Sequence, residues 1–239
     1  MALLLVLISP AVGSFLGVLV DRLPRGEDVI RQPSACRTCG QTLAWADLVP
    51  LVSYLRRRGV CGACGDPIPA FVPLVEVGAT ATAIICVMLA RSDLQAVLGC
   101  LLLWSLLALA VSDVLWFRLP DVLTGAVFVI ALALVLEDPG RDLAAAGLGA
   151  AVGAGAFLAI RISYRAIRGR DGLGLGDVKL MAGLGALMGV AQLPLMVLIA
   201  AVLALAAALF QGRALNRATP LPFGSALSVA AGALWLVSL

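Results

Sequence analysis

The chain consists mainly of apolar runs of about 20 residues, the length that crosses a bilayer as an α-helix. They alternate with short polar turns and lie at residues 1–20, 73–90, 95–112, 121–137, 143–160, 178–191, 193–210 and 221–239. Hydrophobic residues make up 62% of the 239 residues and charged residues only 13%. A soluble globule of this size could not shield so many apolar side chains from water. The sequence therefore predicts an all-α polytopic membrane protein with about eight transmembrane helices.

The distribution of basic residues predicts the orientation of these helices. Because no Lys or Arg precedes the first apolar run, we expect that run to be retained as a helix and not removed as a signal peptide. With the N-terminus outside, one side of the membrane carries all the Lys and Arg except Arg91 and Arg141: Arg22, Arg25, Arg31, Arg37, Arg56, Arg57, Arg58, Arg118, Arg161, Arg165, Arg168, Arg170, Lys179, Arg213 and Arg217. Basic loops face the cytoplasm, so we assign this side to the cytoplasm. We expect Arg91 and the turn at residues 137–142 to be solvated loop ends on the outer side.

Residues 21–72 form the one long polar segment, and it carries two Cys-x-x-Cys pairs. The pairs are separated by 21 residues, and each is followed by a glycine that lets the backbone turn: Cys36, Cys39, Gly40 and Cys61, Cys64, Gly65. This spacing suits four thiolates around one tetrahedral zinc ion, whereas two disulfides would seldom persist in the cytoplasm. Four protein ligands leave no open position, so we expect a structural zinc ion that holds a small cytoplasmic loop subdomain together.

Residues 45–58, between the two pairs, combine an apolar face with a basic run. Such a surface could rest on anionic lipid, or it could bind an acidic ligand.

Two carboxylates interrupt apolar runs at the predicted cytoplasmic boundary. Asp113 ends the third run and Asp177 begins the sixth. An ionisable residue at the edge of a bilayer is costly unless it is paired, hydrated or functional. The chain contains no histidine, so proton transfer must use carboxylates, lysine, tyrosine or cysteine. Two carboxylates that lie close together share a proton, and such a pair can activate water and protonate a leaving amine.

Glycines next to Asp177 are expected to support this site. Gly172, Gly174 and Gly176 permit close backbone approach and unusual dihedral angles, so that an extended substrate strand could lie beside Asp177. Three later glycines are expected to mark a close helix contact: Gly183, Gly185 and Gly189.

Each aspartate also has a purely structural interpretation. Asp177 could be a helix N-cap paired with Lys179, and Asp113 could be a cap that faces Arg118. We interpret Asp121, which follows Pro120, as the start of the next helix and not as a catalytic group.

At this point the residues resemble the type IV prepilin peptidases, also called prepilin leader peptidase/N-methyltransferases, which are integral-membrane aspartic proteases. The resemblance covers nearly the whole chain. It rests on Gly13-Ser-Phe-Leu-Gly-Val18 with Arg22-Leu-Pro24, the paired cysteines, Pro73-Leu-Val-Glu76, the segment 113–121, Gly174-Leu-Gly-Asp-Val-Lys-Leu180 and Pro222-Phe-Gly224.

The resemblance implies that Asp113 and Asp177 are catalytic, supported by Gly174, Gly176 and Lys179, and that they cut the leader of prepilins or pseudopilins. The implied location is the inner (plasma) membrane, with the active site facing the cytoplasm. The implied partners are that substrate and membrane lipid, and no nucleic acid. The expected division is a first transmembrane helix at 1–20, a zinc-binding loop at 21–72 and a peptidase core at 73–239.

The resemblance also implies that S-adenosylmethionine could donate a methyl group to the new N-terminus, and it associates the loop with this reaction. The family usually has Asn where this chain has Gly17, and an Asp-Asn pair where it has Asp47-Leu48. Both departures lie in the methylation-associated part. Ser225 stands where the family usually has proline.

Two other classes of function compete with the peptidase. A proton-coupled transporter would use Asp113 and Asp177 as proton carriers, but such groups are expected near the bilayer midplane, with glycine breaks in both repeats. A non-enzymatic, zinc-bearing scaffold of a pilus or secretion machine would use the two aspartates only as helix caps.

Overall fold

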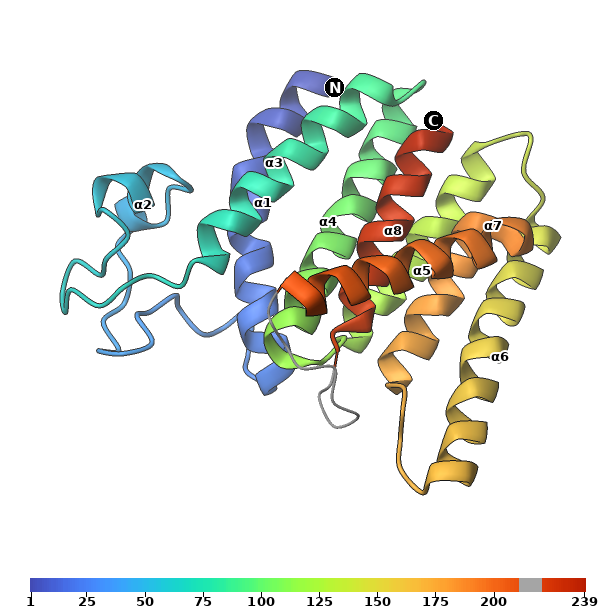
Figure 1. Ribbon diagram of the computed structural model, residues 1–239. Helices are drawn as coiled ribbons and strands as arrows, with labels where there is room; N and C mark the ends of the chain where they lie inside the picture. Colours follow the sequence, from blue (N-terminus) through green and yellow to red (C-terminus); the bar gives the residue numbers. More distant parts are fainter. Residues whose placement is uncertain (211–220) are drawn as a thin grey trace.

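The computed structural model describes residues 1–210 and 221–239, which are almost entirely helical (Figure 1). The α-helices are α1 (Ala2–Arg22), α2 (Val52–Arg56), α3 (Phe71–Leu89), α4 (Asp93–Trp116), α5 (Asp121–Glu137), α6 (Leu143–Arg168), α7 (Leu175–Phe210) and α8 (Phe223–Ser238). Short 3-10 helices lie at Leu23–Arg25 and Trp45–Asp47. Within the described residues the only β pairing is two isolated bridges, Ala35 with Thr42 and Val60 with Pro67.

The prediction of a polytopic all-α membrane protein is confirmed. Five helices are long and apolar enough to cross a membrane, namely α1 with the turn after it, α3, α4, α6 and α7. Helices α5 and α8 are apolar but shorter, with 17 and 16 residues. Every predicted apolar run coincides with one of these seven helices to within two residues at its ends or lies inside it.

Helix α7 contains two of the predicted runs, 178–191 and 193–210, as two arms that meet at a break. Gly189 has φ +71° and ψ +167°, a conformation that interrupts the helix and that residues with a side chain rarely adopt. The break leaves carbonyls at the end of the first arm without their helical partners. The guanidinium of Arg141, from the turn between α5 and α6, donates a hydrogen bond to the carbonyl of Leu187. The expectation that the whole 137–142 turn is solvated is therefore wrong for Arg141, because this side chain caps the broken helix.

Glycines bring α6 and α7 into close contact, as predicted for Gly185. A Cβ on Gly149 would overlap the carbonyl oxygen of Gly185, and a Cβ on Gly185 would overlap that of Gly149. One turn further along α6, a Cβ on Gly153 would lie 2.8 Å from the carbonyl oxygen of Met181. Gly189 lies beside Gly149 as well, in addition to breaking the helix. The first arm of α7, which carries Asp177, is thus held against α6 by backbone contact.

Helix α4 lies at the centre of the bundle and contacts α1, α3, α5 and α8. Its Leu102 and Leu109 are fully buried, as are Leu180 and Leu184 in α7. In Figure 1 the ends of α1, α4 and α6 and the starts of α5, α7 and α8 lie at one end of the bundle, and both chain termini lie at the other. Arg91 and Arg141 line a pocket together with Leu239 at the end with the termini. These two arginines are thus at the opposite end from Arg22 and Arg168, which end α1 and α6. Arg213 and Arg217 lie outside the described residues.

The contact between α6 and α7 predicts a position-dependent effect of adding one methyl group. Gly149→Ala should destabilise the protein by about 1–3 kcal/mol, because the new Cβ meets backbone that can move only with its whole helix. Gly155→Ala is the matched control on the same helix, since a Cβ there meets nothing within 4 Å. Thermal unfolding in detergent measures both variants, and equal melting temperatures would contradict this account of the contact.

Candidate active site

Asp113 lies in the last turn of α4, and its side chain is buried, with the residue only 6% exposed. The helix ends just after it because Phe117 adopts a left-handed conformation (φ +50°, ψ +37°), and the N–H of Phe117 donates to the carbonyl of Asp113 at 2.9 Å. The hydroxyl of Ser112 donates to the carbonyl of Arg118 at 2.8 Å, which closes the same turn. The turn thus fixes the backbone around Asp113.

Asp177 lies in the first turn of α7 and is half-buried. Its Oδ2 accepts a hydrogen bond from the N–H of Gly174 at 3.2 Å, so the carboxylate reaches back over the start of the helix as a capping residue does. The structural interpretation of Asp177 as a cap is therefore partly right. A carboxylate has two oxygens, and Oδ1 faces the start of α8.

The start of α8 lies against both aspartates. The N–H of Ser225 donates to Oδ2 of Asp113 at 2.8 Å. A Cβ on the neighbouring Gly224 would lie 3.1 Å from Oδ1 of Asp177. Two carboxylates that are 64 positions apart in the sequence thus lie next to neighbouring residues, Gly224 and Ser225, at the start of α8.

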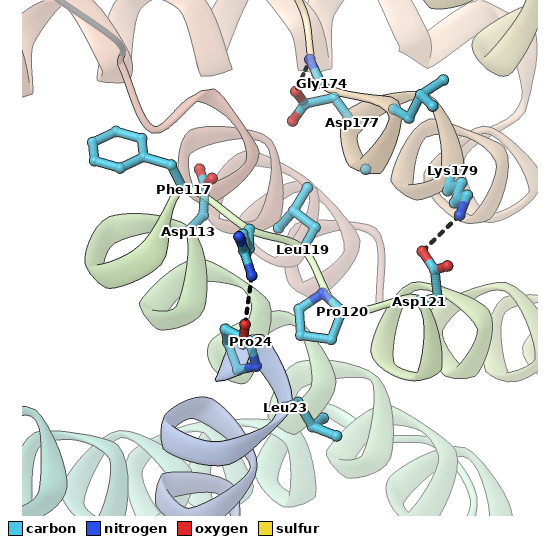
Figure 2. Close-up of a pocket in the computed structure, with 13 residues that line it drawn as sticks. Leu23, Pro24, Asp113, Phe117, Leu119, Pro120, Asp121, Gly174, Asp177 and Lys179 are labelled. Atoms are coloured by element: carbon cyan, nitrogen blue, oxygen red, sulfur yellow. Dashed lines mark hydrogen bonds and ion pairs between the residues drawn. The ribbon is translucent and has the colours of Figure 1, made fainter. Parts of the chain in front are cut away.

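Both carboxylates face one pocket of about 410 Å³ at this end of the bundle (Figure 2). Its walls come from the 3-10 helix after α1, the end of α4 with the turn that follows it, and the starts of α5 and α7. The lining residues are Leu23, Pro24, Asp113, Phe117, Arg118, Leu119, Pro120, Asp121, Gly174, Leu175, Gly176, Asp177 and Lys179. The pocket therefore contains all the predicted catalytic and supporting residues. The pair lies at the end of the bundle and not in its middle, which is unlike the placement expected for a transporter's proton carriers.

Two glycines make room for Leu119 in the wall of the pocket. A Cβ on Gly176 would lie 2.8 Å from Cβ of Leu119, and a Cβ on Gly224 would lie 2.8 Å from its Cδ1. The expected close approach is thus present, but the expected unusual dihedral angles are not, because Gly172, Gly174 and Gly176 are absent from the positive-φ residues.

Lys179 and Arg118 do not pair with the aspartates as the structural interpretations suggest. Nζ of Lys179 donates to Oδ1 of Asp121 at 2.7 Å, and both side chains are largely exposed. The guanidinium of Arg118 donates to the carbonyl of Pro24 at 2.7 Å, which ties the end of α1 to the pocket. Lys179 and Arg118 are thus engaged away from Asp177 and Asp113, respectively.

Sequence reasoning missed two contributions. The backbone of Ser225 bonds to Asp113, and the only signal for it was the segment Pro222-Phe-Gly224, which predicts a helix start. Glu76, in α3, is 4% exposed, and its Oε2 accepts the N–H of Leu51 at 2.8 Å. Leu51 has φ +59° just before α2, so a buried carboxylate holds the loop against the bundle at a residue of rare backbone conformation.

The four loop cysteines form a cluster in which all four Sγ atoms lie within 4.8 Å of one another. Cys36 Sγ and Cys64 Sγ are 3.9 Å apart. Thiolates bonded to zinc at about 2.3 Å in a tetrahedron would be separated by about 3.8 Å, so the donor set fits one zinc ion.

The two halves of the cluster have the same backbone geometry. Gly40 and Gly65 have φ +71° and +77°, and their N–H groups donate to the carbonyls of Cys36 and Cys61. The predicted role of these glycines in turning the backbone is confirmed. Backbone N–H groups of Cys39 and Thr38 lower the pKa of the Cys36 thiol to about 6, and those of Cys64 and Ala63 lower the pKa of Cys61. A lowered pKa favours the thiolate that binds metal at these two positions, whereas burial and the neighbouring thiols raise the pKa of Cys64.

Ion pairs connect the loop with the helix bundle and with itself. Arg37, inside the first Cys-x-x-Cys pair, bonds to Asp21 at the end of α1 and to Glu27. Its hydrogen bond lowers the pKa of Glu27. Within the loop, hydrogen bonds from Arg57, with Arg56 contributing, lower the pKa of Asp47. The first cysteine pair is thereby joined to the helix that ends at the pocket.

Comparisons with known proteins show the family of the chain. Residues 7–90 match the bacterial peptidase A24 N-terminal domain, and residues 100–209 match the type IV leader peptidase family. No solved structure matches the chain significantly.

Among the relatives is a prepilin leader peptidase/N-methyltransferase of Dickeya chrysanthemi, 35% identical over 261 residues that cover 98% of this chain and 92% of the relative. A protein of the same name from Burkholderia pseudomallei strain 1026b is 36% identical, and the match covers 89% of this chain and 70% of the relative. Another, from Dichelobacter nodosus, is 30% identical, and the match covers 98% of this chain and 89% of the relative. The similarity thus extends over nearly the whole chain, and the chain belongs to the type IV leader peptidase family.

Proposed function

We propose that this chain is a membrane aspartic endopeptidase that cleaves the leader peptide of type IV prepilins or pseudopilins, with Asp113 and Asp177 as its catalytic pair. The observation that carries the proposal is the pocket that both carboxylates line, with the start of α8 packed beside both of them. The relatives' name supports the substrate class. Gly174, Gly176 and Lys179 are proposed as supporting residues, the two glycines because they leave space next to Asp177.

In the proposed reaction the two carboxylates share one proton. The charged member takes a proton from water while the water oxygen bonds to the carbonyl carbon, and the protonated member gives its proton to the carbonyl oxygen. When the C–N bond breaks, the first member passes its proton to the amine nitrogen, and the second recovers a proton from the new carboxyl group. One water is consumed, and both carboxylates return to their starting states.

The location of the pocket supports an active site at the cytoplasmic face of the inner membrane. The pocket lies at the end of the bundle where α1, α4 and α6 end, and this is the end with most of the described basic residues. A prepilin carries a short basic leader before an apolar helix, so its scissile bond would lie at the same depth. The proposed division is a first helix, a loop at 21–72 and a peptidase core at 73–239.

The cysteine cluster is proposed to hold one structural zinc ion. The ion would cross-link the two halves of the loop through Cys36, Cys39, Cys61 and Cys64, which leave it no open coordination position. We expect the loop's exposed apolar side chains, Trp45 and Leu55 among them, to rest on membrane lipid.

We also propose that the chain methylates the new N-terminus, with S-adenosylmethionine as donor, because the relatives' name includes N-methyltransferase. Two acidic side chains of this part of the chain are already engaged within the protein. Asp47 is paired with Arg56 and Arg57, Glu76 is bonded to Leu51, and a Cβ on Gly17 would meet nothing within 4 Å.

Replacing either aspartate should abolish cleavage. Asp113→Asn and Asp177→Asn should each lower kcat for a prepilin substrate by on the order of a thousandfold, because asparagine can neither take nor give the shared proton. Asp93→Asn is the matched control, since it lies on the same helix as Asp113 but at the opposite end. Undiminished cleavage by either active-site variant would refute the catalytic pair.

Removing one cysteine of the cluster should abolish metal binding. Cys36→Ser should lower the zinc content of the purified protein from about one ion per chain to nearly none and should make the loop sensitive to trypsin. Cys86→Ala, in the bundle core, should leave the zinc content unchanged. Full zinc content in Cys36→Ser, or none in the wild type, would contradict the proposed site.

The proposed orientation predicts which loops are accessible from outside the cell membrane. An epitope inserted at Gly140 should bind antibody in intact spheroplasts, whereas one inserted at Gly169 should do so only after permeabilisation. The reverse pattern would place the pocket on the outer side.

A further inference from the structure

Ser225 makes two hydrogen bonds through different groups. Its backbone N–H donates to Oδ2 of Asp113 at 2.8 Å, and its hydroxyl donates to the carbonyl of Pro222 at 2.6 Å. The side chain thus closes the first turn of α8, while the backbone N–H forms a hydrogen bond with Asp113. The two contributions can be separated by mutation.

The N–H of Ser225 belongs to the first turn of a helix of 16 residues, where backbone N–H groups have no partner within the helix. The buried carboxylate of Asp113 supplies the missing acceptor. An N–H group can only donate, so Oδ2 is the acceptor, and such a bond is stronger to a charged carboxylate than to a neutral carboxyl group. The positive end of the α8 dipole adds to the preference for a negative charge at this place.

Asp177 accepts a weaker hydrogen bond, although it also lies in the positive first turn of a helix. Its bond from the N–H of Gly174, at the start of α7, is longer, at 3.2 Å. The two carboxylates therefore differ in their hydrogen-bond donors, since Asp113 accepts an N–H from α8 whereas Asp177 accepts one from the start of its own helix.

We propose that Ser225 is a positioning residue whose backbone N–H keeps Asp113 as the charged member of the pair. This inference rests on the proposed function and deepens it. Asp113 takes the proton from water on its other oxygen, Oδ1, as the water oxygen bonds to the carbonyl carbon, and Asp177 gives its proton to the carbonyl oxygen. Asp113 then protonates the leaving amine nitrogen, and Asp177 recovers a proton from the new carboxyl group.

The residue type at 225 is what makes this bond available. Proline, which the family usually has here, carries no N–H and could not donate to Asp113. Proline is tolerated in the first turn of a helix because no intrahelical bond is lost there, and the preceding Gly224 has no Cβ to clash with its ring. Ser225→Pro therefore removes the bond with little harm to the fold.

The test compares two variants of the full-length protein with a prepilin substrate. Ser225→Pro should lower kcat about tenfold with little change in KM, because one hydrogen bond to a charged group is lost. Ser225→Ala, which loses the hydroxyl but keeps the N–H, should retain the wild-type kcat. Wild-type kcat in Ser225→Pro, or an equal loss in both variants, would overturn the proposal.

The outcome is distinguishable from failure of the proposed function, because Asp113→Asn serves as the reference. If Asp113→Asn is inactive and Ser225→Pro is fully active, only the role of Ser225 is refuted. If Asp113→Asn is active, the catalytic pair itself is refuted.

A second measurement does not depend on any variant that could misfold. A small epoxide is opened by a carboxylate and should esterify Asp113 in the wild-type protein, as mapped by mass spectrometry. Asp113 is the more buried of the two, so preferential reaction there cannot be explained by access. Esterification of Asp177 instead would overturn the assignment of the charged member.

Discussion

The structure depends on stabilising two carboxylates at the end of an apolar helix bundle. Burying a carboxylate is costly unless hydrogen bonds or charges compensate for the lost water. Here the compensation comes from helix starts, because the N–H of Ser225 in α8 bonds to Asp113 and the N–H of Gly174 at the start of α7 bonds to Asp177. Helices α4, α7 and α8 must therefore end or begin at the same level, and their packing is the condition for the site.

That packing relies on small residues and on one break. Gly149 and Gly185 let α6 and α7 touch through their backbones, and Gly189 lets the chain leave the first arm of α7. At the opposite end of the bundle from the pocket, Arg141 satisfies a carbonyl that the break exposes. On the pocket side, Arg118 bonds to the end of α1, and Arg37 of the cysteine loop bonds to Asp21 in the last turn of that helix. The loop and the pocket are thus both attached to the C-terminal end of α1 and the turn that follows it.

Much of this could be predicted from the sequence, because the signals were strong and local. Apolar runs located the helices, basic residues divided the bundle into two sides, and the spacing of the cysteines indicated a cluster of four ligands. Asp113 and Asp177 stood out as charges at the edges of apolar runs. What could not be predicted depended on contacts between distant segments. Neither the partner of Arg141 nor the bond from Ser225 to Asp113 has a sequence pattern of its own, and Gly189 could not be distinguished from a packing glycine.

The claim that Asp113 and Asp177 converge can be tested directly by chemical cross-linking. A double variant with Asp113→Cys and Asp177→Cys, treated in membranes with a short reagent that joins two thiols, should give an intramolecular cross-link between these positions by mass spectrometry. A cross-link at high yield is the predicted result. Labelling of both positions by single-ended reagent without any cross-link between them would show that the two side chains do not share a pocket, and it would contradict the account.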